Sequence, residues 1–251
     1  MHPVLFSVGR FTFYTYGLML GLGFAAGVFL ASRRAEAKEL NPDSLFWFFI
    51  LLLVGGVAGG RLLYVALNRW YYQDWRSILD TTQGGLAIHG VLVGGALTAA
   101  IYSRVKRIPF GKLADLVAPS LILGQAIGRI GCFFSGCCYG IETSGTWGFF
   151  TRFAPGLRHP YQLYESAADF ALFAVLIFLS GKIAFDGGLF AFYVLGYSVL
   201  RLLLEFFRDN DGYLAGLSYG QWGALAGILV GAGLLAYFKT RTAPDLAQPS
   251  A

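Results

Sequence analysis

Seven long stretches of apolar residues run through the chain, and short polar loops separate them. Each stretch approaches the length of about 20 residues that a helix needs to cross a bilayer. The pattern therefore predicts an all-α integral membrane protein with about seven transmembrane helices. The predicted spans are Phe11–Ser32, Ser44–Leu67, Gly85–Ser103, Leu113–Phe133, Tyr161–Leu179, Gly187–Phe207 and Gly220–Phe238.

Composition agrees with this pattern. Hydrophobic residues make up 56% of the chain and charged residues only 13%, with a mean hydropathy of +0.60, which is typical of a membrane protein. The net charge of +5 does not indicate a nucleic-acid partner, because the basic residues lie mainly in short loops. The first apolar stretch is too long for the core of a cleaved signal peptide, so we expect it to stay in the membrane.

The loops also predict an orientation. Lys and Arg are more frequent in the loops after the first, third, fifth and seventh spans than in the others. The positive-inside rule then places the amino terminus outside and the carboxyl terminus in the cytoplasm. We expect one membrane domain over residues 1–240, with an extracytoplasmic loop at 140–158, and a disordered cytoplasmic tail at 241–251. Residues 68–76 mix aromatic and polar side chains and suit the outer interface.

Polar residues within the spans collect, in this topology, toward the outer leaflet. Ionisable side chains are costly in a bilayer and by default indicate a functional site. The residues concerned are Tyr16, Arg61, Tyr64, His89, Arg129, Cys132, Tyr164, Glu165, Tyr197, Arg201 and Glu205.

Structural explanations exist for several of them and stay open. Arg201 and Glu205 are four residues apart on one helix and can neutralise each other. Taken alone, Arg61 is better explained by snorkelling to the outer headgroups. The tyrosines fit an aromatic belt at the interface.

The buried cations have fewer obvious acidic partners, which indicates an anionic ligand, and the abundant anion in a membrane is a phospholipid. Arg129 and Arg201 suit a phosphate through charge-assisted, bidentate hydrogen bonds. Glycines around Arg129 can offer backbone N–H groups to the same phosphate. His89, with glycines on both sides, is the natural general base. This chemistry needs no cofactor.

Six motifs, in this order and spacing, resemble those of the bacterial prolipoprotein diacylglyceryl transferases over nearly the whole chain. They are Phe13–Met19, Gly59–Tyr64, Gly84–Gly90, Gly128–Gly131, His159–Glu165 and Gly196–Arg208. The resemblance implies a multi-pass enzyme of the bacterial inner membrane, with its active site facing the outer leaflet. Such an enzyme moves diacylglycerol from phosphatidylglycerol to the cysteine thiol of a lipoprotein precursor and releases glycerol phosphate.

The resemblance implies that the important positions are Tyr16, His89, Arg129, Gly140, Tyr197 and Arg201. Other polar and thiol residues of the outer leaflet complete the predicted site. The predicted catalytic residues are His89, Arg129, Arg201 and Tyr197. The predicted substrate-binding residues are Tyr16, Arg61, Cys132, Cys137, Gly140, Tyr164, Glu165 and Glu205.

The signature departs from the family after Gly131. The family pattern continues with asparagine, a second asparagine and Gly-Glu, where this chain has Cys132, Ser135 and Gly136-Cys137. With Cys138, these thiols are explained as small buried residues or as a disulfide in an oxidising compartment. Alternatively, one thiol is a nucleophile activated by Arg129. The C-x4-C-C spacing fits no common zinc site, so no metal is expected.

Three functions remain open at this point. The first is the family transfer reaction, on a lipoprotein precursor or on a different cysteine-bearing substrate. The second is a phospholipid-binding membrane protein without catalysis. The third is a thiol redox membrane protein that uses the three cysteines.

Overall fold

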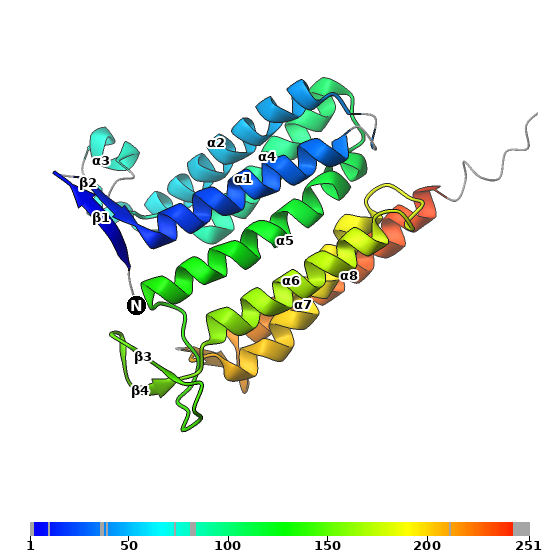
Figure 1. Cartoon of the computed structure of the whole chain (residues 1–251). Coiled ribbons are helices and arrows are strands. Elements are labelled where there is room, and N and C mark those ends of the chain that lie inside the picture. The colour runs from blue at the N-terminus through cyan, green and yellow to red at the C-terminus, as the bar shows by residue number, and fades with distance from the viewer. Residues whose placement is uncertain are drawn as a thin grey trace, which may run out of the picture. The chain divides into compact units, whose positions relative to one another are not determined.

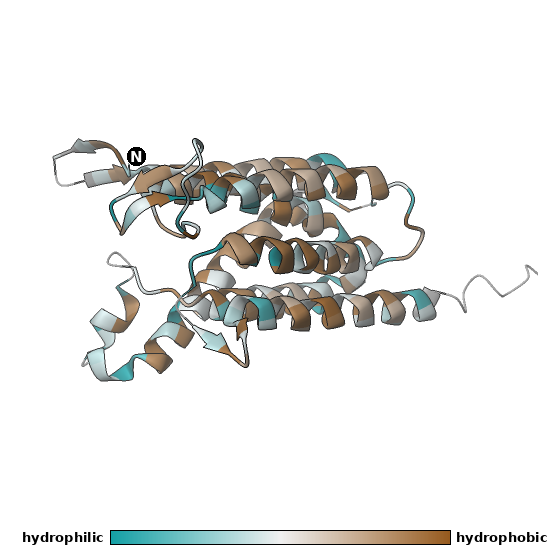
Figure 2. Cartoon of the chain, turned by 90° about the horizontal axis from the view of Figure 1, so that it is seen from below, coloured by the Kyte–Doolittle hydropathy of each residue, from teal (hydrophilic) through white to brown (hydrophobic). Residues whose placement is uncertain are grey.

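The computed structural model describes residues 3–9, 11–35, 38, 40–72, 74–80, 84–210 and 212–242. Among these residues, seven helices are long and apolar enough to cross a membrane (Figure 1). Apolar residues predominate along them (Figure 2). The predicted all-α membrane fold is therefore confirmed. The apolar spans within two of these helices, Ser44–Leu67 and Tyr161–Leu179, coincide with the predicted bounds.

The long helices are α1 (Thr15–Ala35), α2 (Pro42–Leu67), α4 (Ile88–Lys106), α5 (Phe110–Ser135), α6 (Tyr161–Leu179), α7 (Gly188–Leu204) and α8 (Tyr219–Thr242). The shorter helices are η2 (Arg69–Tyr71), α3 (Trp75–Leu79) and η3 (Glu205–Phe207). The strands are β1 (Val4–Val8), β2 (Phe11–Tyr14), β3 (Phe149–Thr151), β4 (Ala154–Arg158), β5 (Tyr213–Leu214) and β6 (Leu217–Ser218), which form three antiparallel hairpins.

The start of the first predicted span is wrong. Residues Phe11–Tyr14 form β2, which pairs with β1, and the helix begins only at Thr15. Gly9, with φ +59°, makes the tight turn between the strands. The aromatic and β-branched residues of this segment favour a hairpin as much as a helix, and hydropathy alone does not separate the two.

The third span also begins later than predicted. Gly84 and Gly85 both have positive φ, near +86° and +85°, and the chain stays extended until Ala87. Helix α4 starts at Ile88, so His89 lies in its first turn.

The chain folds as two compact units, Met1–Ala31 with Ala114–Ala251, and Ser32–Leu113. In the first unit, Ile122 of α5 packs in a buried core with Leu172 and Leu176 of α6 and Leu189 of α7. Helices α1 and α5 approach closely at Gly23, where an added Cβ would lie 3.0 Å from the carbonyl oxygen of Gly124.

The second unit is built on α2 and α4, which pack through small residues. An added Cβ at Gly59 would collide with the carbonyl of Gly90, and one at Gly94 would collide with the carbonyl of Gly55. Helix pairs in membranes use such glycines because they let backbones approach and pack tightly. Gly90 and Gly94, which follow His89, therefore have a structural task.

Helix α8 continues to Thr242, two residues into the segment predicted as the carboxyl-terminal tail. Residues 243–251 lie outside the described part of the chain. The loop predicted at 140–158 contains the β3–β4 hairpin. The single membrane domain and the membrane orientation stay predictions.

Candidate active site

A buried ion-pair network joins α5, α6 and α7 in the first unit. Arg129 Nη2 lies 2.8 Å from Glu165 Oε1, and Arg201 Nη1 lies 3.6 Å from Glu165 Oε2. Glu165 is only 1% exposed. One carboxylate of α6 thus bridges an arginine of α5 and an arginine of α7.

The network continues into η3 and the β5–β6 hairpin. Arg201 Nη2 lies 2.8 Å from Glu205 Oε2, which confirms the predicted pairing of these two residues. The hydroxyl of Ser218 donates to Glu205 Oε1 at 3.0 Å, and Arg208 stands 3.9 Å from Glu205 Oε2. Glu205 therefore ties the end of α7 to the hairpin that precedes α8.

Both buried arginines of the first unit have acidic partners, one of which the sequence analysis did not pair with them. Glu165 contacts both arginines, and Glu205 adds a second carboxylate to Arg201. Sequence reasoning missed the first pairing because Arg129 and Glu165 lie on different helices. Only the rotation of α5 and α6 about their axes brings these side chains together.

The two arginines differ in how much of their hydrogen-bonding capacity remains free. Arg201 uses both terminal nitrogens, on Glu165, on Glu205 and on the hydroxyl of Tyr161. Within the described residues, Arg129 has only the Nη2 contact with Glu165, so Nε and Nη1 remain available. The side chain of Arg129 is 23% exposed and that of Arg201 is 12% exposed. Arg129 is therefore the better ligand for an incoming anion.

Two polar residues of α6 were absent from the predicted site. Tyr161 accepts a hydrogen bond from Arg201 Nη1, and Asp169 is 1% exposed with no hydrogen-bond partner for either carboxylate oxygen among the described residues. Both lie four residues from Glu165, one on each side, and residues at this spacing share a helix face. That spacing was the signal that could have found them.

Two predicted tyrosines lie near the network. The hydroxyl of Tyr197 is 3.4 Å from Glu165 Oε1, to which it donates a long hydrogen bond. Tyr16 packs on the last turns of α5, where an added Cβ at Gly131 would lie 3.3 Å from its Cδ2 atom. The first unit thus brings Tyr16, Tyr197 and the arginines into one region, whereas their roles in binding or catalysis stay predictions.

Gly140 and Tyr164 belong to the frame around this region. The Gly140 N–H donates to the His159 carbonyl at 3.0 Å, and an added Cβ would collide with the carbonyl of Phe207. The hydroxyl of Tyr164 and Nδ1 of His159 hydrogen-bond at 3.0 Å. These contacts show structural tasks for both residues, and their predicted contact with substrate is untested.

The three cysteines converge just after the α5 helix. Cys132 is buried in the last turn of α5, and its Sγ atom and those of Cys137 and Cys138 all lie within 4.8 Å of one another. Cys138 has a left-handed backbone with φ +58°, which turns its side chain back toward the helix. The thiols of Cys132 and Cys137, through hydrogen bonds, and the charge of Arg129 lower the pKa of the Cys138 thiol. All three cysteines are free thiols.

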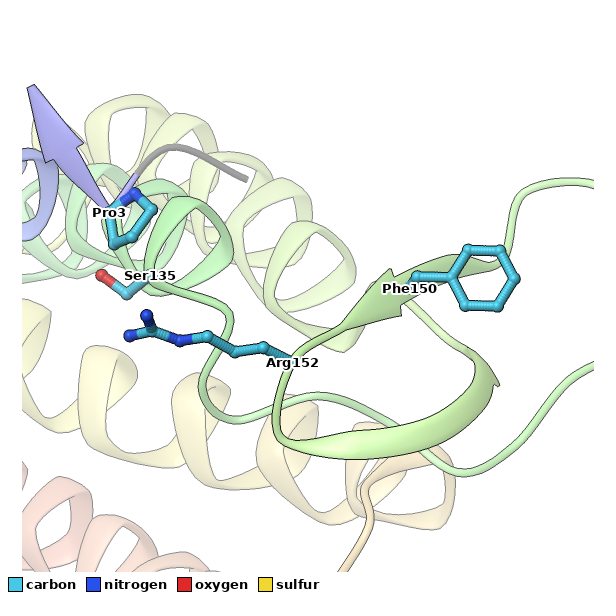
Figure 3. A pocket seen from close by; sticks show the side chains of 4 residues that line it. All are labelled: Pro3, Ser135, Phe150 and Arg152. Carbon is cyan, nitrogen blue, oxygen red and sulfur yellow. The ribbon is translucent and has the colours of Figure 1, made fainter.

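A small pocket lies beside the end of α5. Pro3, Ser135, Phe150 and Arg152 line it. Figure 3 shows the guanidinium group of Arg152, from the turn between β3 and β4, directed toward Ser135, with the ring of Phe150 turned away. Ser135 stands where the family pattern has its second asparagine, so this pocket lies next to the altered signature.

Arg61 has a structural task in the second unit. Its Nε donates to the carbonyl of Ile78 at 2.7 Å, and its terminal nitrogens donate to four more carbonyls. These acceptors are the carbonyls of Ser77, Asp80, Gly84 and Gly85, at 2.6–3.0 Å. The side chain thereby holds α3 and the segment before α4 against α2. Its predicted role in substrate binding is untested.

His89 also belongs to the second unit. It is exposed in the first turn of α4, and the structure records no hydrogen bond to its ring within the described residues. An exposed, unengaged imidazole suits a base that must accept a proton from a substrate. Its predicted action together with Arg129 and Arg201 stays a prediction.

Sequence comparisons agree with the motifs. Residues 3–237 match the sequence profile described as prolipoprotein diacylglyceryl transferase. A protein of Nostoc sp. named phosphatidylglycerol–prolipoprotein diacylglyceryl transferase is 41% identical, covering 99% of this chain and 94% of its own length. A protein with the same name from Trichormus variabilis is 40% identical, covering 97% of this chain and 93% of its own length. Another from Clostridium tetani is 39% identical, covering 92% of this chain and 95% of its own length.

Proposed function

Because the chain belongs to the prolipoprotein diacylglyceryl transferase family, we propose that it transfers the diacylglyceryl group of phosphatidylglycerol to the cysteine thiol of a lipoprotein precursor. The protein is a multi-pass membrane protein. We place it in the bacterial inner membrane, with its active site open to the outer leaflet, on the strength of the family and of the positive-inside pattern.

The reaction exchanges a carbon–oxygen bond for a carbon–sulfur bond. The acceptor thiol loses its proton to His89. The resulting thiolate attacks the carbon of the diacylglyceryl group that is bonded to the phosphate oxygen. The carbon–oxygen bond breaks, its electron pair leaves with the phosphate oxygen, and glycerol phosphate departs. Positive charge near the phosphate stabilises the negative charge that develops on this leaving group.

The observation that carries this proposal is the state of Arg129. Its Nη2 is held by Glu165, while Nε and Nη1 have no partner within the described residues. A guanidinium group held on one side by a carboxylate keeps further N–H donors for a phosphate, with little loss of side-chain entropy. Glu165 thereby orients the arginine that binds the headgroup.

Arg201 is, in this proposal, chiefly a positioning residue. It forms ion pairs with Glu165 and Glu205 and donates a hydrogen bond to Tyr161, and it shares the Glu165 carboxylate with Arg129. Tyr197 holds the same carboxylate from the side through its long hydrogen bond. Substitutions at Arg201 should therefore impair folding and transfer together, whereas substitutions at Arg129 should impair transfer first.

Direct transfer is favoured over a lipid intermediate on one of the three cysteines. A thioether formed between such a cysteine and the glyceryl carbon would have an alkyl thiolate as its leaving group, which departs far less readily than a phosphate. A covalent lipid on Cys138 would therefore be a stable product. This leaves the cysteine cluster without a role in the bond exchange.

The decisive experiment is a transfer assay in nanodiscs with radiolabelled phosphatidylglycerol and a lipobox peptide that has a single cysteine. We expect label on the peptide, and loss of that label with His89→Ala. Arg129→Lys should also impair transfer because a point charge does not reproduce a planar fork. Arg104→Lys, at an exposed position near the end of α4, is the matched control and should retain activity.

Two results would contradict the proposal. If well-folded protein never labels the peptide, two explanations remain. The protein binds lipid without catalysis, or it acts on a different cysteine substrate. Undiminished transfer by the Arg129→Lys variant would show that Arg129 is not the residue that binds the headgroup, although the protein would still be an active transferase.

A further inference from the structure

The cysteine cluster has a geometry that its sequence spacing conceals. Cys132 comes from the last turn of α5, and Cys137 and Cys138 follow after the turn at Gly136. Their three Sγ atoms lie within 4.8 Å of one another, and those of Cys137 and Cys138 are 3.5 Å apart. Three thiols facing a common point from two sides form a potential ligand set.

The loop that carries two of these thiols is held in place. The hydroxyl of Thr151 donates to the carbonyl of Gly136 at 2.8 Å, and the side-chain amide of Gln162 donates to the carbonyl of Cys137. Gln162 is fully buried. In addition, Cys138 keeps a left-handed backbone conformation, which costs an L residue about 1–2 kcal/mol. Strain of this kind persists where the surrounding structure requires it, and it clusters at functional sites.

The arrangement matches the needs of a soft metal ion. Thiolate ligands select ions such as Cu(I) and Zn(II). Three sulfur atoms each about 2.3 Å from one ion, in a trigonal plane, lie about 4 Å from one another. The observed cluster reaches that arrangement with side-chain adjustments of less than an ångström, since its sulfur atoms already lie within 4.8 Å. Three-coordination is complete without a further ligand, and no His, Asp or Glu joins the group within the described residues.

We propose that Cys132, Cys137 and Cys138 form a three-thiolate binding site for a soft metal ion. The bound ion ties the end of α5 to the loop that leads to Gly140. The positive charges of Arg129 and Arg201 act on the Cys138 thiol. The proposed bond exchange itself does not use these thiols.

The chain offers a clean test because these are its only three cysteines. Reduced, purified protein is titrated anaerobically with Cu(I) against a chromophoric Cu(I) chelator. We expect one Cu(I) per chain, with three sulfur neighbours in the X-ray absorption spectrum. Each of the single variants Cys132→Ser, Cys137→Ser and Cys138→Ser should weaken binding by more than the roughly 10–100-fold that loss of an outer-shell partner costs. Ser135→Ala, in the same segment, should bind as the wild type does.

A second measurement needs no substitution and so does not depend on whether the variants fold. Cu(I) should protect all three cysteines of the wild-type protein from alkylation, as read by mass spectrometry. Three results would overturn the proposal. The first is Cu(I) binding by the wild type that is no tighter than binding by the triple Cys→Ser variant. The second is Cu(I) binding, or protection from alkylation, that does not involve Cys132. The third is a disulfide among the three cysteines in protein isolated from membranes without reductant.

Discussion

Removing the charge of Glu165 is the sharpest test of the ion-pair network. Glu165→Gln keeps the shape of the side chain and an acceptor for Tyr197, but it leaves Arg129 and Arg201 without their shared carboxylate. At an effective dielectric constant of about 20, contacts of 2.8 and 3.6 Å correspond to gross Coulomb energies of about 6 and about 5 kcal/mol. Desolvation offsets much of this, and deleting one partner of a buried pair costs about 3–5 kcal/mol net.

The assay is thermal unfolding in detergent, followed by intrinsic fluorescence or by retention in size-exclusion chromatography. A loss of 1 kcal/mol lowers the Tm by about 2–4 °C for a domain of this size, so Glu165→Gln should melt about 6–20 °C below the wild type. Adding Arg129→Gln to this variant should restore part of the loss, because the uncompensated cation is removed with its partner.

Asp169→Asn is the matched control. Asp169 lies one turn from Glu165 on the same helix and is equally buried, yet the structure gives its carboxylate no hydrogen bond or ion pair within the described residues. The change to Asn should therefore leave the Tm at or above that of the wild type. Equal Tm values for Glu165→Gln and Asp169→Asn would refute the idea that Glu165 neutralises the two arginines.

Two further predictions concern the frame around the site. Gly140→Ala forces a Cβ into the carbonyl of Phe207, so it should lower the free energy of unfolding by about 1–3 kcal/mol and abolish most transfer. Gly233→Ala is the control, because a Cβ there meets nothing within 4 Å, and it should melt like the wild type. Arg61→Lys reduces five N–H donations to at most three, so it should cost about 3–6 kcal/mol in the free energy of unfolding at about 1.5–3 kcal/mol per lost charged hydrogen bond. Thermal unfolding of both variants checks these values. If Arg61→Lys is as stable as the wild type, the backbone contacts do not explain Arg61, and the substrate-binding role predicted from the sequence is favoured again.

Sequence alone determined the membrane architecture. Hydropathy is a property of each residue and its neighbours in the chain, and a stretch of about 20 apolar residues has few alternatives to a transmembrane helix. The same local reasoning found the pair of Arg201 and Glu205, because four residues on one helix fix a contact. It failed at Phe11–Tyr14, where a hairpin and a helix satisfy the same apolar pattern.

Tertiary structure decided which side chains meet. Glu165 bridges Arg129 and Arg201 only because α5, α6 and α7 pack with particular rotations. Arg61, like Arg129, is an arginine within a predicted apolar span, yet its guanidinium group donates hydrogen bonds to backbone carbonyls. The sequence names the ionisable groups in the membrane, but their partners depend on contacts between distant segments, which no local pattern encodes.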